Sequence, residues 1–261
     1  MRFASQIKFY RKLRFRKGHG VHSPSIFNLI TKVIEEKSAF YAFDEIEAFR
    51  TELKKSKLSP GESQHRNYGA LLFRLVNHFK CQNILQIYAQ TGIMSLYIAA
   101  ASKDCVCYAI EESTEKISHT KKFAEKKGLH NLRFISGTVS NSIDKLQESV
   151  KHFDLVFVNC NGSAAQTNEA INLCKRFLAE NTVLVVDGIS LNKGMRNIWN
   201  TVKNMPQTVV SLDLYAMGIV LFNKKLNSHH YKIYFDYGKK QNLHPNRRRG
   251  FYFTRRREKN N

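Results

Sequence analysis

The sequence predicts an α/β fold with one mostly parallel seven-stranded sheet and an antiparallel last strand, preceded by N-terminal helices. Two observations support this prediction. From residue 83 onwards, short and continuously apolar runs alternate with amphipathic stretches, a pattern typical of parallel strands covered by helices on both faces. The last two strand-like runs, at 208–214 and 218–223, are separated by a short link, so we expect them to pair antiparallel.

The individual elements follow from the same patterns. Strands are expected at 83–88, 105–110, 132–136, 155–159 and 182–187, followed by the two strands named above, with 231–235 as a further edge strand. Between them, amphipathic helices are expected near 93–102, 114–127, 139–150, 166–179 and 192–204.

The N-terminal part of the chain is expected to be helical. Residues 1–17 have apolar side chains at helical spacing among basic ones, which is typical of an amphipathic helix that lies on anionic lipid or packs on the protein's own core. Ser23 and Pro24 predict a helix start, since serine caps helices and proline suits the first helical position. The expected stripe of this helix is Ile26, Phe27, Ile30, Val33 and Ile34, and further helices are expected at 44–56 and around 71–79. We therefore divide the chain into an N-terminal helical extension (1–65), a main domain (66–236) and a basic tail (237–261).

Charge is concentrated at the two ends of the chain. The formal net charge is +21. Residues 1–20 contain seven Lys or Arg and no acidic residue, and residues 239–261 contain nine basic residues and one acidic residue. Basic ends indicate an anionic partner, either nucleic acid or a membrane surface, or they are solubilising tails without a specific partner. In the tail, arginines alternate with aromatic residues, a composition that can bind phosphate and stack on bases.

The cysteines and the hydropathy pattern exclude several classes of protein. Five cysteines scattered through apolar runs argue against a disulfide framework, and no zinc-ligand spacing is present, so no metal site is predicted. No stretch has the length and apolarity of a membrane span, and the basic N-terminus lacks the apolar core of a secretory signal. A cytoplasmic location is therefore expected.

The candidate site follows from a general rule for open parallel sheets. Ligands bind beyond the carboxyl ends of the strands, near the point where the strand order reverses. This rule selects the loop from Tyr88 to Gly92, Glu111, the pair Gly137 and Thr138, the segment 159–162 and the segment 187–190. A carboxylate at the position of Glu111 can accept hydrogen bonds from both ribose hydroxyls of a nucleoside, or it can simply open the next helix.

At this point the residues resemble a known family. The segment 84–95, ILQIYAQTGIMS, resembles the cofactor-binding motif of class I S-adenosylmethionine (SAM) methyltransferases. GHGVHSP at 18–24, VDGISLNKGMRNIW at 186–199 and SLDLYAMGIV at 211–220 resemble signatures of an O-methyltransferase-like branch common in Bacteroidetes. The likeness runs from about residue 8 to residue 236. It implies a Rossmann-like methyltransferase fold, SAM as cofactor and a small hydroxylated molecule as methyl acceptor.

The resemblance also assigns roles to residues. Gln86, Tyr88, Gly92, Glu111, Gly137 and Thr138 occupy the cofactor-binding positions, and Asp187, Asn159 and Asn161 the catalytic ones. The chain departs from the family pattern at several of these positions. Gln86 replaces an acidic residue, Tyr88 replaces a glycine, and Asp187 is the only carboxylate left where metal-dependent relatives hold magnesium.

Three functions are therefore open. The first is SAM-dependent methyl transfer, with Asp187 as the base or orienting group and Asn159 or Asn161 assisting. The second is a degenerate relative that keeps the fold and works as a binding or scaffold protein, because the departures cluster at ligand-facing strand ends. The third is binding of RNA by the basic tails. The oligomeric state cannot be predicted from the sequence.

Overall fold

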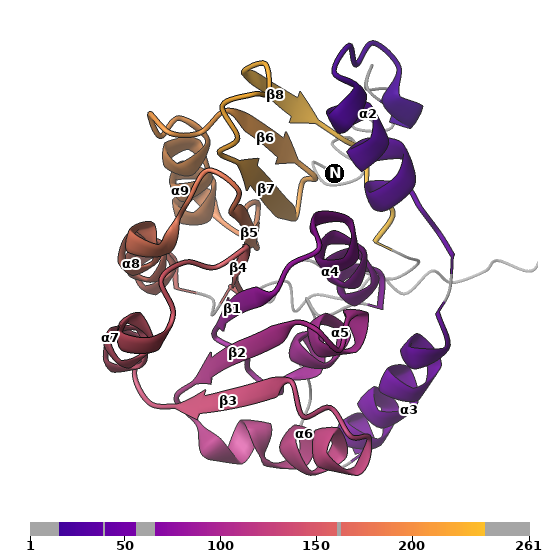
Figure 1. Ribbon diagram of the computed structural model, residues 1–261, viewed down its shortest axis with the longest axis vertical. Helices are drawn as coiled ribbons and strands as arrows, with labels where there is room; N and C mark the ends of the chain where they lie inside the picture. The colour runs from indigo at the N-terminus through magenta and orange to yellow at the C-terminus, as the bar shows by residue number, and fades with distance from the viewer. Residues whose placement is uncertain (1–15, 39, 56–65, 161–162, 238–261) are drawn as a thin grey trace, which may run out of the picture.

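The computed structural model describes residues 16–38, 40–55, 66–160 and 163–237. Its centre is an eight-stranded sheet with the strand order β3-β2-β1-β4-β5-β7-β6-β8, and helices cover both faces (Figure 1). The strands are β1 Asn83–Ile87, β2 Val106–Glu111, β3 Leu132–Ser136, β4 Leu155–Val158, β5 Val183–Asp187, β6 Val210–Asp213, β7 Met217–Leu221 and β8 His229–Lys232. The predicted fold class is confirmed, and the candidate edge strand forms as β8, so the sheet has eight strands instead of seven.

The strand directions also agree with the prediction. β1 to β5 pair parallel with one another. β7, the last of the seven expected strands, is antiparallel to both β5 and β6. β8 pairs parallel with β6 and forms the edge of the described sheet.

A helix follows each of the first five strands, and four of these helices begin at a polar capping residue. The helices are α5 Ile93–Ala101, α6 Thr114–Lys126, α7 Val139–Ser149, α8 Ala164–Cys174 with the short η3 Lys175–Phe177, and α9 Lys193–Lys203. Ser113, Thr138, Ser163 and Asn192 each accept a hydrogen bond from the backbone N–H three residues later. Such side chains satisfy backbone donors that the first helical turn leaves free, which explains where these helices start.

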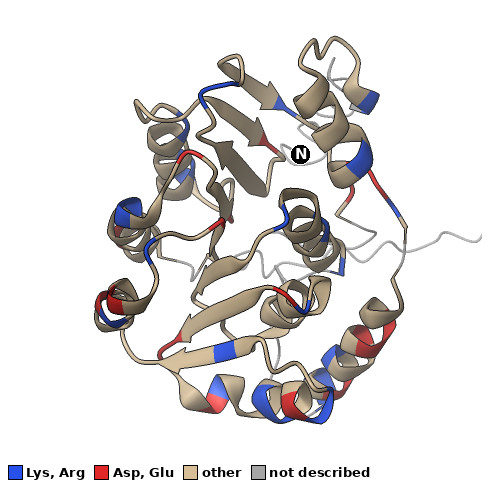
Figure 2. Ribbon diagram, viewed as in Figure 1, with Lys and Arg blue, Asp and Glu red and all other residues tan. Residues whose placement is uncertain are grey.

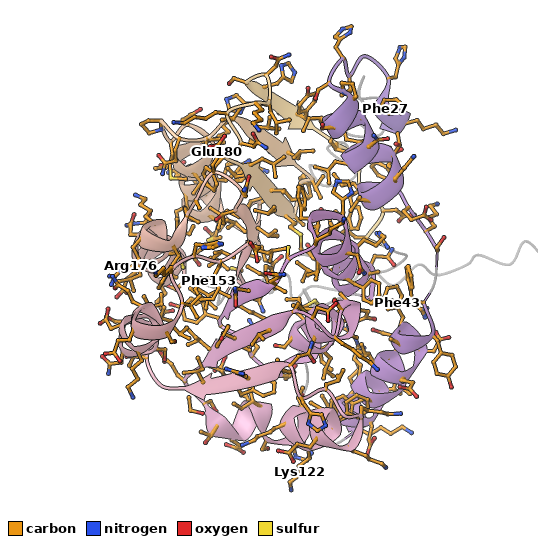
Figure 3. All side chains as sticks on the ribbon, in the orientation of Figure 1. Phe27, Phe43, Lys122, Phe153, Arg176 and Glu180 are labelled. Atoms are coloured by element: carbon orange, nitrogen blue, oxygen red, sulfur yellow. The ribbon has the colours of Figure 1, made fainter. Side chains whose placement is uncertain are left out.

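Two apolar cores lie on opposite faces of the sheet. One contains side chains from α4 (Arg66–Phe79), α5 and the N-terminal helices, and the other contains side chains from α7, α8 and α9. Figure 3 shows Phe43 in the first core and Phe153 in the second. Because neighbouring residues of a strand point to opposite faces, each residue at a strand end can be assigned to one of these two sides.

The N-terminal elements are η1 Arg16–Gly18, α2 Pro24–Leu29, η2 Ile30–Ile34 and α3 Tyr41–Lys55. Ser23 caps α2 and Pro24 is its first residue, as predicted. Ile26, Ile30 and the other members of the predicted stripe are buried, but Phe27 is 41% exposed, so the stripe is narrower than expected. α3 is anchored to α5 by a hydrogen bond of 2.7 Å from the Tyr97 hydroxyl to Glu47.

The charged side chains of the described residues are mixed in sign. Figure 2 shows acidic and basic residues interspersed along α3 and α6. The expected basic helix at 1–17 lies almost wholly outside the described residues, as does the tail from residue 238, so the anionic partner remains a prediction. All five cysteines are buried. Among the helices that the structure describes, none has the length and apolarity needed to cross a bilayer.

Candidate functional site

The strand order reverses between β1 and β4, and the predicted site residues surround this point. β1 lies between β2 and β4 in the sheet, and both pairings are parallel. The loops after β1, β2 and β4 therefore meet at one edge of the sheet. This edge is the expected place for a ligand in an open α/β fold.

The loop after β1 makes a tight turn before α5. Tyr88 and Gln90 both adopt left-handed backbone conformations, with φ of 58° and 54°, and Gly92 caps α5 with φ of 76°. Such values are costly for residues with a side chain. At Gly92 a Cβ atom would also lie 2.9 Å from Thr120 and 3.0 Å from Phe134, so only glycine fits. The loop is consequently held in one strained shape beside the free N–H groups at the start of α5.

Glu111 holds this loop in place. Its side chain is buried at the end of β2, and its carboxylate accepts a hydrogen bond of 2.7 Å from the backbone N–H of Gln90 and one of 3.3 Å from Ser113. Lys116 lies 3.5 Å from the same carboxylate. The side chain thus faces the loop after β1 and not the solvent. An ionised carboxylate has about four acceptor positions, so it can accept a further bond beyond these contacts.

The left-handed turn at Tyr88 changes the direction of its side chain. In regular strand geometry Tyr88 would share a face with Gln86, but its ring packs in the same core as Ile87, on the side of α7 and α8. Its hydroxyl donates a hydrogen bond of 3.3 Å to the carbonyl of Gln166 in α8. Burial raises the pKa of Tyr88, so this hydroxyl stays protonated. The side chain is therefore tied to α8 and does not lie beside Gln86.

Gln86 is fully buried between β1 and α5. Its Oε1 accepts a hydrogen bond of 2.8 Å from Ser95, and its Nε2 has no partner among the described residues. The uncharged amide cannot form the ion pair with a ligand ammonium that a carboxylate at this position would form. A second glutamine, Gln90, donates from its side chain to the carbonyl of Cys160 at 2.9 Å and so links the loops after β1 and β4.

The two residues predicted after β3 lie at the start of α7. Gly137 has φ of 139°, and its N–H donates to the carbonyl of Glu111 at 3.4 Å. Thr138 is the exposed cap of α7, accepting a hydrogen bond from Asn141. The backbone bond between Gly137 and Glu111 brings the ends of β2 and β3 together.

Beyond β4 and β5, polar groups are buried without partners. Asn159 is 1% exposed and Asp187 is 2% exposed, and both lie on the α4 face of the sheet. The Tyr68 hydroxyl, from α4, lies against the Asp187 carboxylate. Tyr68 Oη, Asn159 Nδ2 and Asp187 Oδ1 all lack a geometrically formed hydrogen bond among the described residues. Buried polar atoms without partners are rare in folded proteins and indicate a bound ligand or water.

The Asp187 carboxyl group has an unusual acidity. Burial raises the pKa of Asp187 to about 7, while the N–H groups of Gly188 and Cys160 and the Tyr68 hydroxyl lower it in part. The carboxyl group therefore changes its protonation state near neutral pH. A group with this property can take a proton from a substrate hydroxyl.

Close packing holds the ends of β4 and β5 together. Gly188 has φ of 69°, and a Cβ atom there would lie 2.6 Å from Cys160 Cβ. The glycine after Asp187 is therefore required by the cysteine after Asn159. The other predicted catalytic residue, Asn161, lies outside the described residues. Among the described residues, no group of three or more His, Cys, Asp or Glu side chains is arranged to hold a metal ion.

Sequence reasoning missed two members of this edge. Tyr68 lies in the apolar pattern of α4, where an aromatic residue indicates core packing, so nothing in its neighbourhood marked it. Gln90 was part of the selected loop, but no pattern indicated that its side chain reaches Cys160. Three-dimensional contact alone identifies both residues.

Comparisons with known proteins agree with this geometry. Residues 87–189, from the end of β1 to the end of β5, match the methyltransferase domain family. No curated protein sequence matches the chain.

Solved methyltransferase structures share the fold. The O-methyltransferase TomG from Streptomyces achromogenes, in complex with SAM, superposes with a TM-score of 0.57 at 17% identity, over 71% of this chain and 91% of that one. An O-methyltransferase from Bacillus cereus, in complex with SAH (S-adenosylhomocysteine), gives a TM-score of 0.57 at 14% identity, over 76% and 97% of the two chains. The SAH-bound methyltransferase PaMTH1 from Podospora anserina gives 0.56 at 17% identity, over 77% and 96%. Residues 87–189 thus match a methyltransferase domain, and the fold that the sequence resemblance implied, that of class I SAM-dependent methyltransferases, is confirmed. The more specific resemblance to a branch common in Bacteroidetes stays a prediction.

Proposed function

We propose that this protein binds SAM at the carboxyl edge of β1 to β4 and transfers its methyl group to a hydroxyl oxygen of a small acceptor. The family match covers the strands that form this edge, and structures with the same fold were determined with SAM or SAH. The observation that carries the proposal is the orientation of Glu111. Its buried carboxylate faces the loop between β1 and α5 and retains acceptor capacity.

The proposed cofactor contacts follow from this orientation. Glu111 would accept from the ribose hydroxyls, and the N–H groups that start α5 at Gly92 would face the carboxylate of the amino-acid part. Gly137 and Thr138 would lie beside the adenine. Gln86 and Tyr88 occupy cofactor-binding positions in the family pattern, but their side chains are bonded to Ser95 and Gln166. We therefore assign them a supporting role in shaping the loop.

We place the reaction itself at the ends of β4 and β5, on the other half of the same sheet edge. When bound, SAM supplies a methyl group on a positively charged sulfur. Asp187 would accept the proton of the acceptor hydroxyl, because its carboxyl group titrates near neutral pH and its Oδ1 atom forms no hydrogen bond among the described residues. Asn159 would orient the acceptor through its unpartnered amide, and Asn161 would assist. Orientation and proton removal are the main contributions an enzyme makes to such a displacement.

Calorimetric titration of the full chain with SAM and with SAH tests the cofactor site. We expect both to bind, and Glu111→Ala to weaken binding by about tenfold or more, since hydrogen bonds to a charged group contribute about 1.5–3 kcal/mol. Glu112→Ala is the matched control, because Glu112 is the adjacent carboxylate and is exposed. Thermal unfolding of both variants shows whether the loop remains folded.

Two results would contradict the proposal. One is the absence of SAM and SAH binding at millimolar concentration. The other is a folded Glu111→Ala variant that binds SAM as tightly as Glu112→Ala does. The first result would leave the methyltransferase fold without the reaction and would favour a role as a binding or scaffold protein. The second would show that Glu111 does not hold the cofactor, and would remove the observation that carries the proposal.

A further inference from the structure

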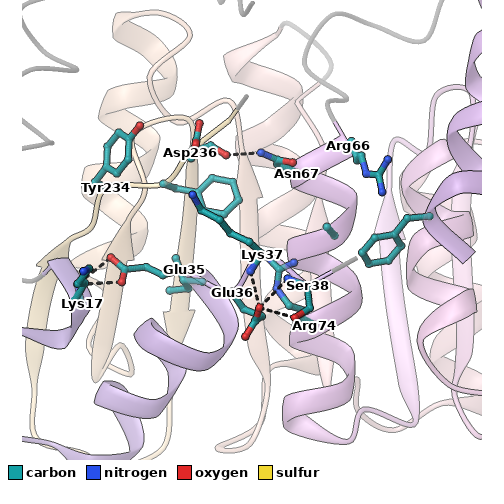
Figure 4. A pocket seen from close by; sticks show the side chains of 14 residues that line it. Lys17, Glu35, Glu36, Lys37, Ser38, Arg66, Asn67, Arg74, Tyr234 and Asp236 are labelled. Carbon is teal, nitrogen blue, oxygen red and sulfur yellow. Dashed lines mark hydrogen bonds between the residues drawn. The ribbon is translucent and has the colours of Figure 1, made fainter. Parts of the chain in front are cut away.

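A cavity lies on the outer side of α4, away from the sheet. Its volume is about 640 Å³, within the range that small-molecule sites occupy. Four parts of the chain line it: Lys17 of η1, the end of η2 with the segment that leads into α3, the first half of α4, and the segment that follows β8 (Figure 4). Asn67, Ala70 and Arg74 contribute the α4 wall, at the spacing of one helix face.

Arg74 is the distinctive group of this cavity. Its side chain is only 8% exposed, and its Nε donates a hydrogen bond of 2.7 Å to the carbonyl of Val33. A guanidinium group has five N–H donors. Within the part of the chain that the structure describes, this bond is the one formed, and no carboxylate makes an ion pair with the guanidinium group. Its two terminal nitrogens are therefore left to face the cavity that it lines.

Glu36 is the acidic group whose charge acts on Arg74, but among the described residues the two side chains form no ion pair. The Oε1 atom of Glu36 accepts hydrogen bonds from Lys37 N–H and from both the N–H and the hydroxyl of Ser38, at 2.7 to 2.8 Å (Figure 4). The carboxylate is thereby tied to its own loop. Burial lowers the pKa of Arg74 to about 10, so the group remains charged at neutral pH.

Lys17, Lys37 and Asp236 also line the cavity, and two further charged groups are engaged elsewhere. Glu35 accepts two bonds of 3.0 Å from the backbone N–H of Lys17, and Arg66 forms an ion pair of 3.0 Å with Asp44. A buried cation without a partner is unfavourable, and a guanidinium group matches the planar geometry of a carboxylate or phosphate. The vacant donors of Arg74 thus call for an oxyanion supplied from outside the described chain.

We propose that this cavity binds a small molecule that carries a carboxylate or phosphate group on an apolar body. The oxyanion would contact Arg74, and the apolar body would contact Ile34, Phe43 and Phe235, which line the same cavity. This site is independent of the proposed methyl transfer. Tyr68, the α4 residue beside Asp187, faces the sheet, whereas Asn67 and Arg74 face the cavity.

The probes are benzoate, phenyl phosphate and the neutral benzamide, titrated calorimetrically into the full chain at constant ionic strength. We expect at least one of the two anions to bind at least tenfold more tightly than benzamide. Tighter binding of phenyl phosphate would identify the natural group as a phosphate, and tighter binding of benzoate would identify it as a carboxylate. Equal binding of all three probes, or no binding at millimolar concentration, would overturn the proposal.

Variants test the role of Arg74. Arg74→Gln keeps a donor for the Val33 carbonyl but removes the charge, and should weaken anion binding at least tenfold while SAM titration is unchanged. Arg66→Gln, at the same cavity but already paired with Asp44, is the control and should change binding less than threefold. If Arg74→Gln does not fold, Ala70→Leu narrows the cavity without removing Arg74 and should also abolish binding. Unchanged anion binding in a folded Arg74→Gln or Ala70→Leu variant would overturn the site.

Discussion

The two halves of the carboxyl edge differ in how their polar groups are satisfied. On the β2 side, Glu111 is bonded to Gln90 and Ser113, and the loop is fixed by Gly92. On the β5 side, Asn159, Asp187 and Tyr68 each have a buried polar atom that forms no hydrogen bond within the part of the chain that the structure describes. The β2 side, whose polar groups bond to one another, is rigid and suited to hold a cofactor that is the same in every reaction. The β5 side is suited to bind a reactant whose polar atoms form the remaining hydrogen bonds.

The largest expected effect is a loss of methyl-transfer rate when only the β5 side is changed. Asp187→Asn removes the proposed base and should lower the rate of methyl transfer by about 10²- to 10⁴-fold, the usual contribution of general acid–base catalysis. SAM affinity should change less than threefold, because the cofactor contacts lie on the other half. With the unmodified protein the rate should rise with pH up to about 7, as the Asp187 carboxylate forms, and then level off. Equal losses of SAM binding and rate would remove the distinction between the halves.

The second effect concerns the contact that joins β4 and β5. Gly188→Ala should destabilise the fold by about 2–4 kcal/mol, because a left-handed residue with a Cβ costs about 1–2 kcal/mol and the Cβ would overlap Cys160. Gly128→Ala is the matched control, since Gly128 has nearly the same φ of 68° but its nearest atom is 3.9 Å away. Chemical denaturation measures both variants. Equal destabilisation would show that backbone conformation alone, and not the Cys160 contact, accounts for the glycine.

A third effect is a dependence of folding stability on pH, which comes from the β5 side. The pKa of Asp187 is raised to about 7, so the folded state favours the protonated form. Between about pH 4 and pH 7 the folded protein holds this proton and the unfolded chain releases it, so stability falls as the pH rises. The free energy of unfolding of Asp187→Asn, measured by denaturation, should therefore rise by about 2 kcal/mol relative to that of the parent protein between pH 4.5 and pH 8. This is about half of the free energy that the raised pKa of Asp187 represents. A difference that does not depend on pH would contradict the raised pKa.

The smallest expected effect tests whether the Tyr68 hydroxyl acts on Asp187. Tyr68→Phe removes a hydroxyl that helps to stabilise the Asp187 carboxylate, so the pKa of Asp187 should rise further and the pH–rate profile should move to higher pH. Stability should change by less than about 1 kcal/mol, because the hydroxyl has no formed hydrogen bond. A loss of rate that is the same at every pH would indicate a packing role only.

The strands of the sheet could be predicted from the sequence, because the apolar pattern that marks each strand lies within the strand itself. The predicted strand at 132–136 is the observed β3, and the ends of the other predicted strands except β8 lie within one or two residues of the observed ones. Apolar runs bounded by capping residues determine these positions. The β8 strand starts two residues earlier than expected, because pairing with β6 determines its start at His229.

The site was less accessible to sequence reasoning, because its geometry depends on a few backbone angles. The position of Tyr88 was predicted, but the direction of its side chain follows from a left-handed φ that no pattern indicates for tyrosine. The partnership of Tyr68 with Asp187 joins residues far apart in the chain. Likewise, only the folded structure shows that Arg74 is buried without an ion pair among the described residues. From the sequence alone, an arginine in an amphipathic helix is expected to have a solvated guanidinium group.

The edge strand β8 has a further consequence for solubility. The outermost strand of a sheet is the place where other chains can associate through strand pairing. β8 has only four residues, and His229, His230 and Lys232 are exposed on it. Such a short, polar strand discourages recruitment of a neighbouring chain.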